Sequence, residues 1–244
     1  MNMLDRQSAL PLHTQFETIL RNKIEDEEWP VNSCIPSENE LGKIYGISRM
    51  TVRSVLNRLV DGGLLYRVQG KGTFVAEPKI VSSPLVRYGL REQLEQMGYE
   101  TYAKTISFEK IGASAKIAKL LNVERGKDIF LIKMLRYVKG IPLSFHVSYV
   151  PVHLFPSLDK WDFEHNLICD VIEKEYHFII QHRIETLEAI TATTEEAWLL
   201  SVHPNSPLLL LENMVYTDKD LPLEYLRIVF RGDKIKIKME YQRP

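Results

Sequence analysis

The chain has 244 residues, of which 45% are hydrophobic, so it is long enough for one or two domains and too apolar to be globally disordered. Its 31 Lys and Arg residues nearly balance its 32 Asp and Glu residues, and the net charge of −1 argues against a protein that binds nucleic acid through bulk positive charge. Two distant cysteines, Cys34 and Cys169, argue against a disulfide framework or a thiolate metal cluster.

Neither a targeting segment nor a membrane span is apparent in the hydropathy pattern. The first residues lack the apolar core of a signal peptide, and the leucine run at 208–211 is too short to cross a bilayer. We therefore expect a cytoplasmic protein, and no residue pattern calls for a metal or another cofactor.

Three helices are predicted in the first part of the chain. Apolar residues at helical spacing predict the first over residues 12–24. Ser37 and Glu40 have the spacing of a capping box at the start of the second, and Gly46 is placed to end it. Ser48 can cap the third, in which an apolar stripe at i, i+3, i+4, i+7 and i+8 begins at Val52. The short turn 46–48 makes the last two helices a helix-turn-helix.

A β-hairpin is predicted to follow the third helix. Residues 64–68 and 73–76 have strand character, and the glycine-rich segment 69–72 between them is typical of a turn. A helix-turn-helix followed by such a hairpin is a winged helix.

The outer face of the third helix has the composition of a surface that reads DNA. Opposite the apolar stripe lie Met50, Arg53, Ser54 and Asn57. Arginine can pair with guanine, asparagine with adenine, and an apolar side chain can touch the thymine methyl group. The segment 41–76 has six basic residues and one acidic residue, a net charge of +5, so the positive charge belongs to a face and not to the whole protein.

A domain boundary is predicted where prolines and serines interrupt the periodic pattern at 77–86. We expect a DNA-binding domain over residues 1–78, a linker at 79–84 and a second domain over 85–244. The second domain contains an internal repeat in which a helix precedes two strands joined by a turn. The strands are predicted at 128–138 and 142–150, and again at 207–217 and 222–231. An antiparallel sheet with helices on one side, an α+β fold, is expected.

The first segment resembles the GntR superfamily of bacterial transcription regulators. The resemblance covers residues 10–76 and rests on the motifs PSENEL at 36–41, YGISRMTVR at 45–53, LVDGGLL at 59–65 and GKGTFV at 70–75. It implies DNA contacts from the start of the third helix and from the tip of the wing, and many relatives carry arginine where this chain has Asn39. The predicted DNA-binding residues are Ser37, Asn39, Ser48, Arg49, Met50, Thr51, Arg53, Asn57, Gly70, Lys71, Gly72 and Thr73.

The second segment resembles the UTRA effector-binding domain of the HutC branch, which shares its fold with chorismate lyase but acts as a sensor. The motifs are RYVKGIP at 136–142, YVP at 149–151, TATTEEA at 191–197 and FRGD at 230–233. The resemblance implies a small-molecule effector, such as a sugar, a sugar phosphate or a related catabolite. It also implies a repressor, a homodimer and a palindromic operator of double-stranded DNA.

The expected pocket departs from relatives that sense amino-sugar phosphates. Their Arg-x-Arg pair is Met134 and Arg136 here, Leu167 and Cys169 replace a serine and a tyrosine, and His146 replaces one glutamate. We expect Arg136 to meet an anionic or polar part of the effector; the alternative is that it pairs with a strand carboxylate. The predicted effector-binding residues are Tyr88, Gly89, Arg136, His146, Cys169, Glu224 and Phe230.

Two other functions are compatible with parts of the same sequence. A lyase-like enzyme fused to a winged helix is the main alternative, although no catalytic motif supports it and we expect no catalytic residue. A winged helix that serves protein contacts, with its arginines merely solvating a surface, is the other alternative.

Overall fold

The computed structural model describes residues 4–83 and 90–240, which form two compact units. One unit comprises Met1–Ile80 with Gly232–Lys234, and the other comprises Val81–Arg231 with Ile235–Pro244. Each unit has its own hydrophobic core and is described separately below.

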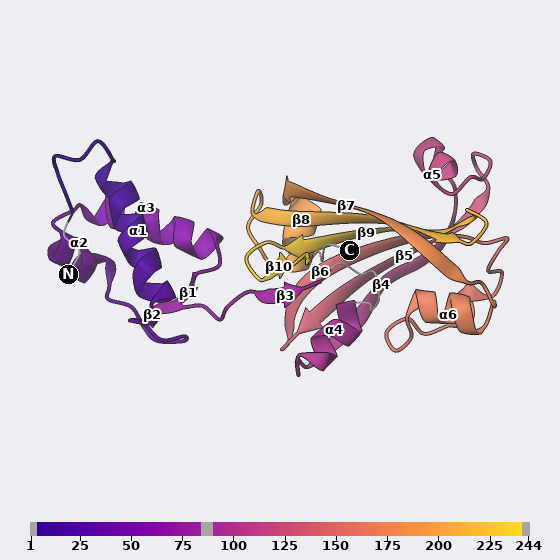
Figure 1. The fold of residues 1–244 in the computed structure, drawn as a ribbon, viewed down its shortest axis with the longest axis horizontal. Helices are drawn as coiled ribbons and strands as arrows, with labels where there is room; N and C mark the ends of the chain where they lie inside the picture. The colour runs from indigo at the N-terminus through magenta and orange to yellow at the C-terminus, as the bar shows by residue number, and fades with distance from the viewer. Residues whose placement is uncertain (1–3, 84–89, 241–244) are drawn as a thin grey trace. The chain divides into compact units, whose positions relative to one another are not determined.

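The N-terminal unit is a winged helix, as predicted (Figure 1). Its elements are α1 (Leu12–Glu25), α2 (Glu38–Tyr45), α3 (Arg49–Asp61), β1 (Leu65–Val68) and β2 (Gly72–Val75). The two strands pair antiparallel, with Leu65 opposite Val75. Four residues of the apolar stripe of α3, from Val52 to Leu59, are buried in one cluster with Phe16 and Leu20 of α1, and Val60 is partly buried against it. This packing leaves the opposite side of α3 facing outward.

The start and the end of α2 and the start of α3 have the caps that the sequence predicts. The Ser37 hydroxyl accepts the backbone N–H of Glu40, and the Glu40 carboxylate accepts the backbone N–H of Ser37 in return. Gly46 ends α2 in the left-handed conformation with φ 63°, which glycine adopts at little cost. The Ser48 hydroxyl then accepts the backbone N–H of Thr51 and begins α3.

The C-terminal unit is built on a six-stranded antiparallel sheet in the order β4-β5-β6-β9-β8-β7. The strands are β4 (Thr101–Gly112), β5 (Asp128–Val138), β6 (Ile141–Pro151), β7 (Ile180–Thr191), β8 (Pro207–Thr217) and β9 (Pro222–Arg231). The helices are α4 (Leu90–Gln96), α5 (Ala115–Leu120), α6 (Ile168–Lys174) and α7 (Thr194–Leu200), with a 3₁₀ turn at Leu158–Lys160. The four predicted strands are confirmed as β5, β6, β8 and β9.

The repeat is larger than the sequence indicated. Each half is a strand, a helix and two further strands, β4-α5-β5-β6 and β7-α7-β8-β9, and the halves meet where β6 pairs antiparallel with β9. The edge strands β4 and β7 were not predicted. Every position of β7 is exposed or half-buried, so it lacks the apolar run that marks the central strands.

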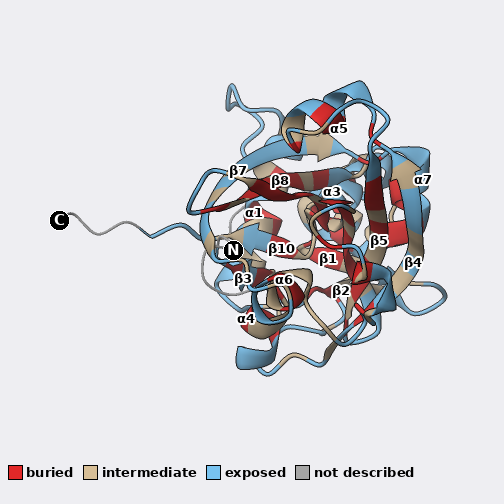
Figure 2. Ribbon diagram, turned by 90° about the vertical axis from the view of Figure 1, so that its right-hand side faces the viewer, coloured by how far each residue is buried: buried red, intermediate tan, exposed pale blue. Residues whose placement is uncertain are grey.

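Helices cover both faces of the sheet, which corrects the expectation of helices on one side. Leu135 on β5 packs against Leu199 of α7, whereas Ile132 on the same strand packs against Ile172 of α6. Because alternate residues of a strand point to opposite faces, α6 and α7 lie on opposite sides. Figure 2 shows the buried positions concentrated along strands such as β5 and β8, with exposed outer surfaces on the helices.

The predicted linker also contains regular structure. Ile80–Ser82 form a short strand, β3, which pairs with β10 (Ile235–Ile237) in a two-stranded sheet. The pairing brings the C-terminal part of the chain back to the segment that was expected to be a simple linker. The strand was missed because prolines and serines surround only three suitable residues.

The α2 cap generates a stability prediction. We expect Ser37→Ala to lower the free energy of unfolding of the N-terminal unit by about 1 kcal/mol, since the backbone N–H of Glu40 loses its acceptor and the Glu40 carboxylate loses the hydroxyl that donates to it. Urea titration followed by circular dichroism measures it. Ser37→Thr keeps the hydroxyl and should lose much less, so equal losses in the two variants would contradict the capping role.

Candidate functional site

The outer face of α3, composed of Met50, Arg53, Ser54 and Asn57, is exposed as the helical spacing predicts. Met50 is an exposed hydrophobic residue, with 70% of its surface in solvent. An exposed apolar side chain beside arginine and asparagine suits contact with base edges, which present both methyl groups and hydrogen-bonding groups. This arrangement distinguishes the face from a uniformly charged surface.

Arg49 at the start of α3 is held by an acidic residue of α2. Its Nε atom lies 3.0 Å from Glu38 Oε2, and Arg67 Nη2 of β1 lies 3.6 Å from the other oxygen of the same carboxylate. The Arg49 side chain is 65% exposed, and an exposed ion pair contributes little free energy. Glu38 therefore orients Arg49 without preventing it from reaching another anion.

Arg58, which flanks the outer face of α3, has a structural role. Its Nε atom lies 3.0 Å from Glu17 Oε2 of α1, and the same carboxylate pairs with Arg21 one turn along α1. For this arginine, the interpretation as a surface residue that stabilises the fold is the better one.

The remaining predicted DNA-binding positions lie at the start of α2 and at the hairpin tip. The Ser37 hydroxyl serves the cap, whereas Asn39 is exposed. Gly70 and Gly72 have φ values of 74° and 133°, which explains why glycine occupies both sides of the exposed Lys71. Thr73 follows on β2 and is half-buried.

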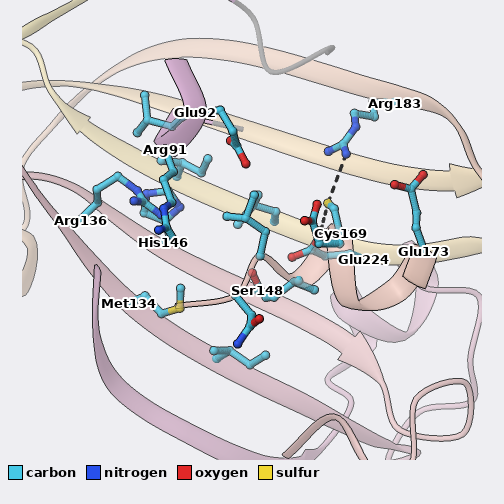
Figure 3. Close-up of a pocket in the computed structure, with 18 residues that line it drawn as sticks. Arg91, Glu92, Met134, Arg136, His146, Ser148, Cys169, Glu173, Arg183 and Glu224 are labelled. Carbon is cyan, nitrogen blue, oxygen red and sulfur yellow. Dashed lines mark hydrogen bonds between the residues drawn. The ribbon is translucent and has the colours of Figure 1, made fainter. Parts of the chain in front are cut away.

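A cavity of about 280 Å³ lies in the C-terminal unit on the α6 side of the sheet. Four predicted effector residues line it: Arg136, His146, Cys169 and Glu224. They come from β5, β6, α6 and β9, so residues spread over 89 positions of sequence meet only because the sheet pairs those strands (Figure 3). The side chains of Ile132, Leu226 and Ile228 form an apolar part of the same wall.

Arg136 is the most unusual group in the cavity. The residue is 5% exposed, and its Nε and Nη1 atoms have no hydrogen-bond partner among the described residues. Burial, together with the nearby charge of Arg91, lowers the pKa of its guanidinium to about 10, while Glu92 and Glu95 act in the opposite direction. Within the described part of the chain no carboxylate forms an ion pair with it, which does not favour the alternative of a strand carboxylate.

His146 lies beside Arg136 and stays neutral. It faces the cavity but is otherwise enclosed by protein, and this burial together with the charge of Arg136 lowers its pKa to about 3. Its Nε2 atom is 2.8 Å from the hydroxyl of Ser144. A neutral imidazole can offer a ligand one donor or acceptor without repelling a cation.

A second polar group occupies the far end of the cavity (Figure 3). Arg183 Nη2 donates to the sulfur of Cys169 at 3.2 Å, and that sulfur lies 4.0 Å from Glu224 Oε2. Burial raises the pKa of the Cys169 thiol to about 11, mainly by desolvation, so the thiol is neutral and unreactive. Burial also raises the pKa of Glu224, while the Ser148 hydroxyl and Arg183 favour its charged form.

Three predicted effector residues are not placed in the cavity. Tyr88 and Gly89 lie outside the described residues. Phe230 is buried and lines a separate cavity of about 70 Å³ beside Leu187 and Leu211, so the structure does not bring it together with Arg136. On β9 it lies two residues beyond Ile228, the last residue of that strand to line the larger cavity.

Five charged residues of the cavity were missed: Arg91, Glu92, Asp170, Glu173 and Arg183. Arg91 and Glu92 enter from α4, and Arg183 enters from the unpredicted strand β7. The hydrophobic periodicity of the sequence did not indicate them, since a charged residue on a short amphipathic helix or an edge strand normally faces solvent. Their position depends on contacts such as the hydrogen bond from Arg91 Nη1 to the carbonyl of His165 at 2.9 Å.

Other site types find little support in the described residues. None of the helices placed by the structure is long and apolar enough to span a membrane. Among the same residues, no group of three or more His, Cys, Asp or Glu side chains is arranged to hold a metal ion.

Together the fold and the cavity define a class: a winged-helix protein joined to a sheet domain with a small-molecule pocket. Comparison with known families confirms and sharpens this class. Residues 12–75 match the family described as bacterial regulatory proteins, gntR family, and residues 96–236 match the UTRA domain. The chain belongs to the GntR family and carries a UTRA domain, as the motifs indicated.

Relatives match over nearly the full length. The chain is 32% identical over 231 residues to the HTH-type transcriptional repressor NagR of Bacillus subtilis, covering 95% of each chain. It is 27% identical to the histidine utilization repressor of Pseudomonas putida, covering 97% of this chain and 94% of that one. PhnF from Mycobacterium smegmatis shares the fold, with a TM-score of 0.63, 22% identity and coverage of 93% and 100%. The first two relatives are named repressors, and the lyase alternative gains no support from them.

The unpartnered guanidinium predicts a gain in stability on its removal. We expect Arg136→Met to raise the free energy of unfolding of the ligand-free C-terminal unit by about 1–3 kcal/mol, because a desolvated charge with unfilled donors is replaced by an apolar side chain. Differential scanning calorimetry measures it. Arg227→Met is the control: Arg227 donates twice to Glu196 at 3.1 Å, so its loss should destabilise the unit. Destabilisation by both variants would contradict this assignment.

The pKa of His146 predicts a pH dependence. Its folded pKa is about 3 and its unfolded pKa is near 6.5, so the unfolded chain binds an additional proton between these values and stability falls as the pH is lowered through this window. His146→Gln should therefore lose about 1 kcal/mol less free energy of unfolding than the wild type between pH 6.5 and 5.5. Urea titrations at both pH values measure the difference, and parallel losses would show that His146 does not titrate as described.

Proposed function

We propose that this protein is a cytoplasmic transcriptional repressor whose affinity for a DNA operator is controlled by a small molecule bound in the cavity of the UTRA domain. One observation carries the proposal: the chain that exposes a polar recognition face on α3 also buries a guanidinium with unfilled donors in a cavity of about 280 Å³. The first feature suits DNA, and the second suits a ligand with an acceptor group.

The proposed DNA contacts divide into base readout and backbone positioning. Arg49 and Arg53 reach guanine edges, Asn57 reaches adenine, and Met50 touches a thymine methyl group, all in the major groove. The N-terminus of α3 at Ser48 and the wing residue Lys71 bind phosphates. The +5 charge of segment 41–76 assists association, while specificity depends on the outer face of α3.

A homodimer on a palindromic operator follows from the small footprint of one recognition helix. A single helix reads only a few base pairs, and two-fold pairing of proteins on a two-fold symmetric site multiplies the contacts. Effector binding would then change the spacing of the two winged helices by shifting the population between two conformations.

The effector belongs to the class of sugars, sugar phosphates or related catabolites, with Arg136 meeting its acceptor group and Glu224 and His146 orienting it. The names of NagR and of the histidine utilization repressor support a repressor, the commoner mode, in which the effector releases DNA.

The proposal predicts a separation of DNA binding from effector binding. An operator is first selected from random double-stranded DNA with the full chain, and it should be preferred over random DNA by roughly 10³ or more at fixed salt. Arg49→Ala should weaken operator binding by at least about 10-fold through the loss of one base contact and leave the thermal shift produced by an effector unchanged. Electrophoretic mobility shifts measure the first effect.

A matched control uses Arg21→Ala, which removes the same charge from α1, where Arg21 pairs with Glu17. This variant should bind the operator nearly as well as the wild type. Equal weakening by both variants would show that α3 contributes only its positive charge to DNA binding. Equal affinity of the wild type for operator and random DNA would refute the proposal that the protein is a sequence-specific regulator.

A further inference from the structure

The end of the cavity at Arg136 contains a second orphaned polar atom, of opposite charge. The Oε2 atom of Glu92, on α4, is buried and has no hydrogen-bond partner among the described residues. Glu92 lines the same cavity as Arg136, and Figure 3 shows both side chains toward the same end of it. An unfilled guanidinium and an unfilled carboxylate oxygen therefore face one ligand volume.

The two groups interact but do not satisfy each other. The carboxylate of Glu92 is near enough to favour the charged form of Arg136, yet the described residues contain no ion pair or hydrogen bond between them. Arg91 does not fill the gap, because its Nε atom donates to Glu95 at 2.8 Å and its Nη1 atom donates to the carbonyl of His165. A buried polar atom without a partner costs free energy, so both atoms are positioned for groups that the fold itself does not supply.

A simple anion would satisfy only half of this arrangement. A carboxylate or phosphate placed on Arg136 would share the cavity end with the unpaired oxygen of Glu92, and the two negative charges would repel each other in a desolvated site. A ligand with an ammonium group beside its anion removes the conflict, because the carboxylate meets Arg136 while the ammonium donates to Glu92. His146 is neutral at this end and opposes neither charge.

We propose that the effector is a free α-amino acid, whose carboxylate binds Arg136 and whose ammonium group binds Glu92. This inference rests on the proposed effector function of the cavity and, within that function, favours an amino acid over a sugar or a sugar phosphate. The side chain of the amino acid passes the apolar wall of Ile132, Leu226 and Ile228. Its end reaches the polar group of Cys169, Arg183 and Glu224, which favours a long side chain with a terminal hydrogen-bonding group.

The first experiment measures binding to the full chain by isothermal titration calorimetry with each of the twenty proteinogenic L-amino acids. At least one should bind saturably with one molecule per chain. For the tightest binder, three analogues are then compared: hydrogen in place of the amine, hydroxyl in place of the amine, and carboxamide in place of the carboxylate. Each should bind at least about tenfold more weakly, because each lacks the opposite charge that pairs with Glu92 or with Arg136.

A pair of variants on α4 assigns the ammonium contact. In Glu92→Gln the preference for the amino acid over its deaminated analogue should fall to less than about threefold. Glu95→Gln is the matched control: it removes the same charge from the same helix, and Glu95 also acts on Arg136, but it does not line this cavity. Glu95→Gln should keep the full preference.

The outcomes separate this inference from the proposed function. If no amino acid binds, or if the deaminated analogue binds equally well, the amino-acid inference is overturned. If acetate, succinate or glucose 6-phosphate then binds in the wild type and not in Arg136→Met, the effector cavity stands with a different ligand class. If none of these compounds binds, and if Arg136→Met also leaves the free energy of unfolding unchanged, the effector role of the cavity is refuted as well.

Discussion

A charged side chain that the fold buries but does not satisfy is the constraint on which the C-terminal unit depends. Arg136 is 5% exposed and keeps two donor atoms without partners, so the sheet must be stable enough to carry a group that opposes folding. That stability comes from two apolar clusters on opposite faces, around Phe155 beneath α6 and around Val229 beneath α7. A site that weakens its own fold in this way is typical of a position selected for binding.

In the N-terminal unit, the packing of α3 orients the residues of its outer face. The core of this unit buries one side of α3 against α1, and this packing alone decides that Met50, Arg53 and Asn57 face outward. Glu38 then orients Arg49 through an exposed ion pair that another anion can replace. The near-neutral net charge of the chain is consistent with this design, because a reading face needs a few oriented groups and not a large positive field.

Much of the fold could be predicted from local patterns. The capping residues Ser37 and Ser48, the left-handed Gly46 and the four apolar central strands each follow from a short-range rule of hydrogen bonding, backbone conformation or hydrophobic spacing. The missed elements lacked such a signal, because β7 is largely exposed and β3 is only three residues long. The sequence also did not show that α6 and α7 cover opposite faces of the sheet. That difference depends on which alternate residues of β5 each helix contacts.

The sequence by itself determined the class of the protein, because the winged-helix motifs and the strand repeat are encoded by neighbouring residues. It also singled out Arg136, His146, Cys169 and Glu224 through the resemblance of their motifs. Only the tertiary structure decided that Arg91, Glu92 and Arg183 join them and that Phe230 does not. The physical reason is that the cavity is formed by strand register and by two helices laid across the sheet, so its charge pattern depends on contacts between residues far apart in the chain.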